Sequence, residues 1–236
     1  MKNSGQLNQI LKEALKREPK GRFLFLTLTA KNAEGAVLKP RLREMGRAVY
    51  KLFQYKRTAK NLLGYVRSTE VTVNDDGPVP VYHYHMHVLI FVKSTYFRAD
   101  QYITQADWTK FWQRAMKLDY QPVVNVKAVH PHPEKNKNSL LASAQETAKY
   151  QVKSADILTN EEGRDLQVID DLEQGLAGTR QISYGGLLKQ IRKELQLEDA
   201  ENGDLVNTDN GDDETGEVVR EVIAKWNAQR QNYYVM

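Results

Sequence analysis

Three histidines alternate with bulky side chains in the segment 82–91, Tyr-His-Tyr-His-Met-His-Val-Leu-Ile-Phe. Its apolar and aromatic composition predicts a β-strand, in which successive side chains point to opposite faces. His83, His85 and His87 would then share one face, with neighbouring residues about 7 Å apart along the strand. Two of these imidazoles could lean onto one divalent ion, which histidine nitrogens bind at about 2.0–2.2 Å. The pattern therefore predicts a metal site.

The number and spacing of these histidines decide between a metal site and an ordinary core position. A single histidine on an apolar face is more often a core residue, but three at a spacing of two favour metal binding. A structural zinc site would more often use cysteine, and the chain has none. We therefore expect a metal that takes part in chemistry, with one coordination position open to a substrate.

A second predicted strand, 64–73, should form a hairpin with the histidine strand. Residues 74–78, Asn-Asp-Asp-Gly-Pro, have the composition of the turn between them. In this antiparallel pair Glu70 lies roughly across from the histidines. Its carboxylate would complete a site of two histidines and one acid, which suits Mn²⁺ or Mg²⁺. The alternative is a structural role, as the cross-strand partner of an arginine or a protonated histidine.

A predicted helix over 139–153 carries a second group of chemically capable residues. Glu146 and Tyr150 are four residues apart, which places them on one helix face about 6 Å from each other, with Lys149 and Lys153 beside them. A tyrosine has a pKa near 10, so its attack on phosphorus needs nearby cations and a metal-polarised phosphate. Tyr150 is one of twelve tyrosines, and the spacing alone does not select it.

The remaining patterns supply the elements around these residues. Strands are predicted over 22–30 and 123–129, and helices over 6–17, 39–63, 100–118, 187–197 and, at the end of the chain, 218–231. In the strand 22–30, Phe23, Phe25, Thr27 and Thr29 share one face, for which a covering helix is a commoner neighbour than DNA. The helix over 39–63 has a basic outer face that could follow phosphates.

The charge distribution favours a polyanionic partner. The formal net charge is +4, yet the segment 196–217 contains nine acidic residues and no lysine or arginine, so the rest of the chain carries +13. Such an excess suits DNA or RNA, although a soluble basic protein would look the same. No stretch approaches the roughly 18 apolar residues of a membrane span. We expect a cytoplasmic protein that has no membrane partner.

Several of these motifs, in this order, match one family. The chain resembles the plasmid rolling-circle replication initiators of Gram-positive bacteria, members of the HUH endonuclease superfamily with a single catalytic tyrosine. The matching segments are 25–29 (Phe-Leu-Thr-Leu-Thr), 83–89 (His-Tyr-His-Met-His-Val-Leu) and 146–150 (Glu-Thr-Ala-Lys-Tyr), with 64–70 and 178–185 as further similar segments. The resemblance covers about residues 21–195.

The resemblance implies a role for each matched residue. His85 and His87 would be the paired metal ligands, Glu70 the third ligand with His83 as its rival, and Tyr150 the nucleophile. Glu146 would activate water at termination. The implied reaction is metal-dependent nicking of origin DNA, single-stranded or extruded as a hairpin, which leaves a 5′-phosphotyrosyl enzyme and a free 3′-hydroxyl primer. A host helicase and polymerase are implied as partners, and the resemblance leaves open whether the chain forms a homo-oligomer.

These observations predict an α+β fold with a central antiparallel sheet and flanking helices, in the ferredoxin-like arrangement of HUH nucleases. The sheet should carry the metal site, with the helices on its other side and one helix presenting Tyr150. We expect an endonuclease domain over 1–195, an acidic disordered segment over 196–217 and a short helix within 218–236. The alternatives are a related relaxase or transposase, or a non-catalytic nucleic-acid-binding module with a structural metal.

Overall fold

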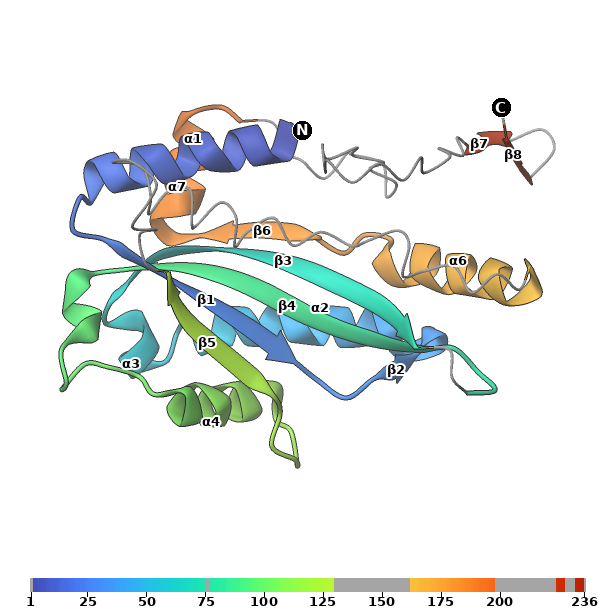
Figure 1. Cartoon of the computed structure of the whole chain (residues 1–236), viewed down its shortest axis with the longest axis horizontal. Coiled ribbons are helices and arrows are strands. Elements are labelled where there is room, and N and C mark those ends of the chain that lie inside the picture. The colour runs from blue at the N-terminus through green and yellow to red at the C-terminus, as the bar shows by residue number, and fades with distance from the viewer. Residues whose placement is uncertain (1, 75–76, 130–161, 198–223, 228–231, 236) are drawn as a thin grey trace, which may run out of the picture. The chain divides into compact units, whose positions relative to one another are not determined.

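The computed structural model of the chain describes residues 2–74, 77–129, 162–197, 224–227 and 232–235. The first 202 residues and the remaining residues form separate units, and each is described by itself. Within the described part of the first unit, the centre is an antiparallel sheet in the order β5-β1-β4-β3-β6, with the short β2 paired to β4 (Figure 1). The strands are β1 (Arg22–Thr29), β2 (Ala33–Glu34), β3 (Leu62–Asn74), β4 (Val81–Val92), β5 (Val124–Val129) and β6 (Ile182–Gly185). The predicted α+β class is confirmed.

The larger core lies on the sheet face that bears Leu24, Leu26 and Leu28 of β1. Among the described residues, the helices α2 (Gly35–Leu52), α4 (Gln105–Met116) and α6 (Glu162–Leu176) cover this face. From α4, Trp108 and Trp112 are almost fully buried, and the Trp112 indole Nε1 donates a hydrogen bond to the Thr29 carbonyl oxygen at 2.9 Å. This bond fixes α4 at the end of β1.

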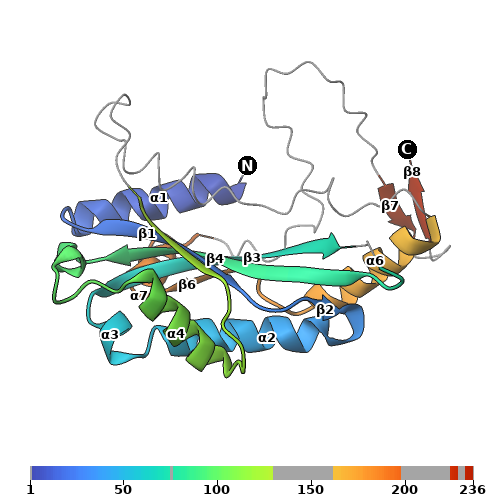
Figure 2. The ribbon, with the colours of Figure 1, turned by 60° about the horizontal axis from the view of Figure 1, so that its bottom comes forward.

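The opposite sheet face, which carries the histidines, is also covered by helices over part of its length. There α1 (Lys2–Arg17) and α7 (Gly186–Glu194) lie over the sheet (Figures 1 and 2). They pack on Phe23, Leu89 and Phe91. The expectation that the helices lie only on the other side of the sheet is therefore wrong. The cause is in the strands: the same face is apolar at Phe23 and Phe91, where α1 and α7 pack, and becomes polar at Thr27 and His87.

The long helix predicted over 39–63 is wrong in its bounds. The structure has α2, which ends at Leu52, a single turn α3 (Lys56–Ala59), and then β3 from Leu62. The Thr58 hydroxyl donates hydrogen bonds to the carbonyl oxygens of Leu52, at 2.5 Å, and Tyr55, at 3.0 Å. These contacts tie the single turn α3 to the end of α2, where the chain turns back toward the sheet.

One further helix was predicted to start too early, and another was not predicted. The helix predicted from residue 100 is α4, which begins after Thr104, whose side chain accepts a hydrogen bond from the Asp107 backbone N–H. The 3₁₀-helix η1 (Ser94–Phe97) precedes it. The helix α6 was not predicted, and α7 corresponds to the basic helix expected over 187–197.

The second unit contains an antiparallel pair of strands, β7 (Ala224–Asn227) and β8 (Asn232–Val235). The prediction of a short helix within 218–236 is therefore wrong for these residues. The sequence of β8, Asn-Tyr-Tyr-Val, is rich in aromatic and β-branched residues, which favour an extended chain. The acidic segment falls almost entirely outside the described residues.

A helix that spans a membrane needs about 20 predominantly apolar residues in a row. Among the described residues, no helix is both long and apolar enough to cross a bilayer.

Candidate metal centre

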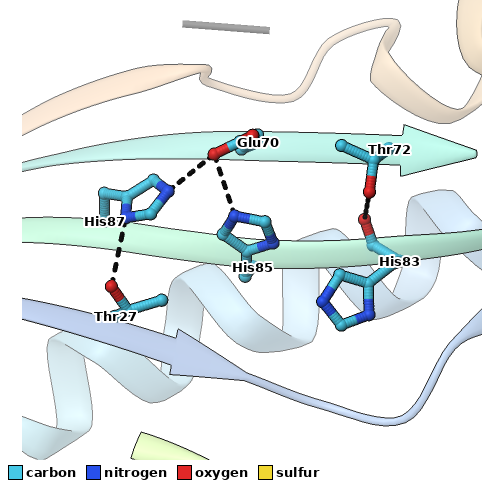
Figure 3. A network of polar contacts seen from close by, with 6 residues as sticks. All are labelled: Thr27, Glu70, Thr72, His83, His85 and His87. Carbon is cyan, nitrogen blue, oxygen red and sulfur yellow. Dashed lines mark hydrogen bonds and ion pairs between the residues drawn. The ribbon is translucent and has the colours of Figure 1, made fainter. Parts of the chain in front are cut away.

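Strand register brings the predicted residues of the metal site together. In the β3–β4 pair Glu70 is the direct partner of His85, and Ser68 is the partner of His87. The predicted hairpin, with Glu70 across from the histidines, is confirmed. On the other side of β4, Thr27 of β1 is the partner of His87. Figure 3 shows the rings of His85 and His87 directed toward the Glu70 carboxylate.

Both histidines contact the same oxygen of Glu70. The His85 Nε2 atom lies 2.8 Å from Glu70 Oε2, and the His87 Nε2 atom lies 2.6 Å from it (Figure 3). The side chains are largely buried, with 13% of His85, 10% of His87 and 18% of Glu70 exposed. One ligand atom from each residue falls within 4.8 Å of the other two. The cluster is thus compact.

The third histidine lies outside this cluster. The His83 Nδ1 atom is 2.8 Å from the Asn32 side-chain oxygen, and its backbone carbonyl accepts a hydrogen bond from the Thr72 hydroxyl at 3.4 Å. Its ring centroid is 5.3 Å from that of His85. Among the described residues, the group that could hold a metal consists of Glu70, His85 and His87. The geometry therefore favours Glu70 over His83 as the third ligand.

Two residues of β1 hold the His87 ring in place. The Phe25 ring is stacked on it with a centroid distance of 5.4 Å and an interplanar angle of 13°. The Thr27 Oγ1 atom lies 3.3 Å from His87 Nδ1. A hydroxyl can donate or accept, so Thr27 serves the ring whether its proton is on Nε2, facing Glu70, or on Nδ1, with Nε2 bound to a metal. The sequence analysis missed both roles, although strand alternation had placed Phe25 and Thr27 on one face.

Burial favours the neutral, metal-binding form of His85. It lowers the pKa of His85 below the ordinary value of 6.5, although the neighbouring Glu70 carboxylate acts in the opposite direction. Burial likewise lowers the pKa of His83, with His85 as a second cause. A neutral imidazole has a lone pair to offer, whereas a protonated one has none.

The donor atoms fit a divalent cation. Ligands about 2.1 Å from a metal in octahedral geometry are about 3.0 Å apart at adjacent positions. The two observed nitrogen–oxygen distances of 2.6 and 2.8 Å need to lengthen by only a few tenths of an ångström to reach this value. Two imidazole nitrogens and a carboxylate also match the ligands that first-row metals use when open positions remain for a substrate.

The other predicted site residues, Glu146, Lys149, Tyr150 and Lys153, fall outside the described residues. Their segment follows β5, which pairs with β1 at the edge of the sheet. Their roles stay predictions.

Known proteins match the whole chain. It matches the family described as "Replication protein" over residues 1–235. A "Protein rep" of Lentilactobacillus hilgardii is 65% identical over all of this chain and 74% of its own length, and one of Lactiplantibacillus plantarum is 58% identical over all of this chain and 75% of its own. A "Replication protein" of Staphylococcus aureus is 44% identical over all of this chain and 99% of its own length. No solved structure matches.

Proposed function

We propose that this chain, which belongs to the replication protein family, initiates rolling-circle replication of a plasmid by nicking one strand of the origin DNA. The observation that carries the proposal is the cluster of His85, His87 and Glu70 on the sheet. Two imidazole nitrogens and a carboxylate are ligands that first-row metals use when open positions remain for a substrate, which is what a metal-dependent nicking reaction needs.

Each residue of the cluster has a separate task. His85 and His87 each offer an imidazole nitrogen, and Glu70 offers a carboxylate oxygen that favours a cation in a largely buried place. Phe25 and Thr27 hold His87 in the orientation that points Nε2 at the cluster. A bound divalent ion, Mn²⁺ or Mg²⁺, would supply Lewis-acid polarisation of the scissile phosphate.

The proposed nucleophile is Tyr150. Its phenolic oxygen attacks phosphorus, forming a new P–O bond while the bond to the 3′-oxygen breaks. The phenol loses its proton and the leaving 3′-oxygen gains one, so the products are a 5′-phosphotyrosyl enzyme and a 3′-hydroxyl that can prime synthesis. Lys149 and Lys153 would stabilise the phenolate and the phosphate, and Glu146 would activate water at termination.

The proposal extends to the setting of the reaction. The nicking domain spans 1–195 and acts in the cytoplasm on origin DNA that is single-stranded or extruded as a hairpin. A host helicase and a polymerase then use the 3′-hydroxyl. The phosphotyrosyl bond conserves the energy that rejoins the strand at the end of a round.

The test compares wild-type protein with Tyr150→Phe on a supercoiled plasmid that carries a verified origin, with Mn²⁺ or with EDTA. Tyr102→Phe is the matched control, because Tyr102 is a surface tyrosine of the first unit, 45% exposed. We expect nicked DNA and a covalent protein–DNA adduct with the wild type and Tyr102→Phe in Mn²⁺ only, and neither with Tyr150→Phe. An adduct in Tyr150→Phe would refute the assignment of the nucleophile. DNA binding without nicking by the wild type would favour a binding module.

A further inference from the structure

A groove lined by arginines lies on the sheet face opposite the candidate metal centre. It has a volume of about 640 Å³ and is bordered by Arg43, Arg47 and Tyr50 of α2, Arg67 of β3 and Arg180 before β6. We call it the arginine groove.

Helical spacing explains one wall of the groove. Arg43, Arg47 and Tyr50 stand at positions i, i+4 and i+7, so they follow one face of α2, and all three are exposed. Gly46 lies between them, where an added Cβ would be 3.4 Å from a terminal nitrogen of Arg67. The absence of a side chain at residue 46 thus keeps the space between α2 and β3 open.

Hydrogen bonds position the guanidinium at the floor of the groove. The Arg67 Nη1 atom donates to the Arg180 carbonyl oxygen and to the Thr69 hydroxyl, both at 3.3 Å. Gly178, with φ of +65°, turns the chain just before Arg180, a conformation that glycine adopts without strain. The segment before β6 is thereby held against β3.

The charge of the groove selects an anion. Four arginines and no carboxylate are found among the described residues that line it. A concave surface with one sign of charge concentrates counter-ions, and guanidinium groups bind phosphates through paired hydrogen bonds. Tyr50, which is 63% exposed at the rim, offers an aromatic face on which a base can stack.

We propose that the arginine groove binds a short segment of single-stranded DNA, as a second DNA site behind the candidate metal centre. The inference rests on the proposed function for the identity of the partner. The volume is typical of pockets for small ligands, about 300–1,000 Å³, so it admits one or two nucleotides and excludes the wider double helix.

The groove shares its strands with the metal cluster. Thr69 and Met86 line the groove, and their direct neighbours in the chain are Glu70, His85 and His87, which point to the other face. Because these neighbours belong to the same two paired strands, a DNA segment in the groove would hold in place the backbone that carries all three candidate ligands.

The test measures binding of a fluorescent oligothymidylate by anisotropy in EDTA over a range of salt concentrations. We expect Arg43→Ala/Arg47→Ala to reduce the slope of log affinity against log salt by about 1.4, because each phosphate contact to a single strand contributes about 0.7. The matched control is Arg98→Ala/Lys110→Ala, which removes the same charge from exposed positions outside the groove. Tyr50→Ala should weaken binding at least about 5-fold.

Equal loss of slope and affinity in the groove and control variants would overturn the proposal. An equal loss for duplex and single-stranded DNA would overturn the assignment to a single strand. Circular dichroism and the Mn²⁺-dependent melting shift establish that each variant is folded. This assay measures binding and not nicking. A wild type that fails to nick in the plasmid assay would refute the proposed function, whereas the difference in binding between the groove and control variants decides the groove proposal.

Discussion

Replacement of Glu70 separates the two roles that its carboxylate has beside His85 and His87. Without a metal, the Oε2 atom accepts hydrogen bonds from both rings, at 2.8 and 2.6 Å. Glu70→Ala removes the acceptor oxygen that the two rings share, and each unpaired buried donor costs about 1–3 kcal/mol. Since the rings are 13% and 10% exposed, water compensates in part, and we expect a total loss of about 2 kcal/mol. Glu70→Gln keeps an acceptor oxygen and should cost less than about 1 kcal/mol.

The effect of these changes on metal binding should be the same for both variants. At a concentration of 100 times its Kd, a ligand stabilises the folded protein by about 2.7 kcal/mol. For a chain of 236 residues this corresponds to a rise in Tm of about 5–11 °C. Glu70→Gln and Glu70→Ala should each lose most of this rise, because both lose the charged ligand.

The assay is thermal unfolding in EDTA and in a Mn²⁺ titration, with isothermal calorimetry as an independent measure of Kd. Glu44→Gln is the control, because it neutralises a carboxylate of α2 that pairs with Arg41 on the surface. It should keep the full rise in Tm. The reasoning fails if Mn²⁺ raises the Tm of Glu70→Gln as much as that of the wild type, or if the two Glu70 variants are equally stable in EDTA.

Three further predictions concern the same chemistry. His85→Ala or His87→Ala should abolish nicking in the plasmid assay while oligonucleotide affinity changes less than about 3-fold, because phosphate contacts dominate binding; nicking at the wild-type rate would exclude the residue as a ligand. Thr27→Val removes the hydroxyl beside His87 Nδ1 and should weaken Mn²⁺ binding by about 10–100-fold in calorimetry, and an unchanged Kd would deny Thr27 a role. Glu146→Ala should nick normally but accumulate unterminated products on gels, and normal termination would remove Glu146 from the mechanism.

The local part of the site was accessible from the sequence. Two strands joined by a short polar turn have one natural pairing, so the residue pattern alone predicts that Glu70 lies across from the histidines. The ordered motifs also indicated the family, which the comparisons confirm. Strand alternation alone could not choose between Glu70 and His83, because both lie on the same face. The choice comes from the side-chain geometry: the Glu70 carboxylate contacts both His85 and His87, whereas His83 contacts Asn32.

The non-local features could not be read from the sequence. The apolar stripe of α1, which includes Ile10 and Leu11, predicts that this helix packs against the rest of the domain, but it does not predict which face of the sheet the helix covers. The end of α2 depends on hydrogen bonds of Thr58, which the continuing apolar pattern hides. The arginine groove is likewise formed by residues from α2, β3, β4 and the segment before β6, among them Arg43, Arg67 and Arg180.

The hairpin that carries the candidate ligands has a consequence for the order of folding. Glu70 and His87 are only 17 residues apart in the chain, so the loop between them closes at a small entropic cost. A metal could therefore bind once β3 and β4 have paired, before β1 arrives with Thr27 and Phe25. If this hairpin belongs to the folding nucleus, Mn²⁺ accelerates refolding in stopped-flow measurements instead of only slowing unfolding. The same cation would then first stabilise the paired strands during folding and later act as the cofactor of the proposed reaction.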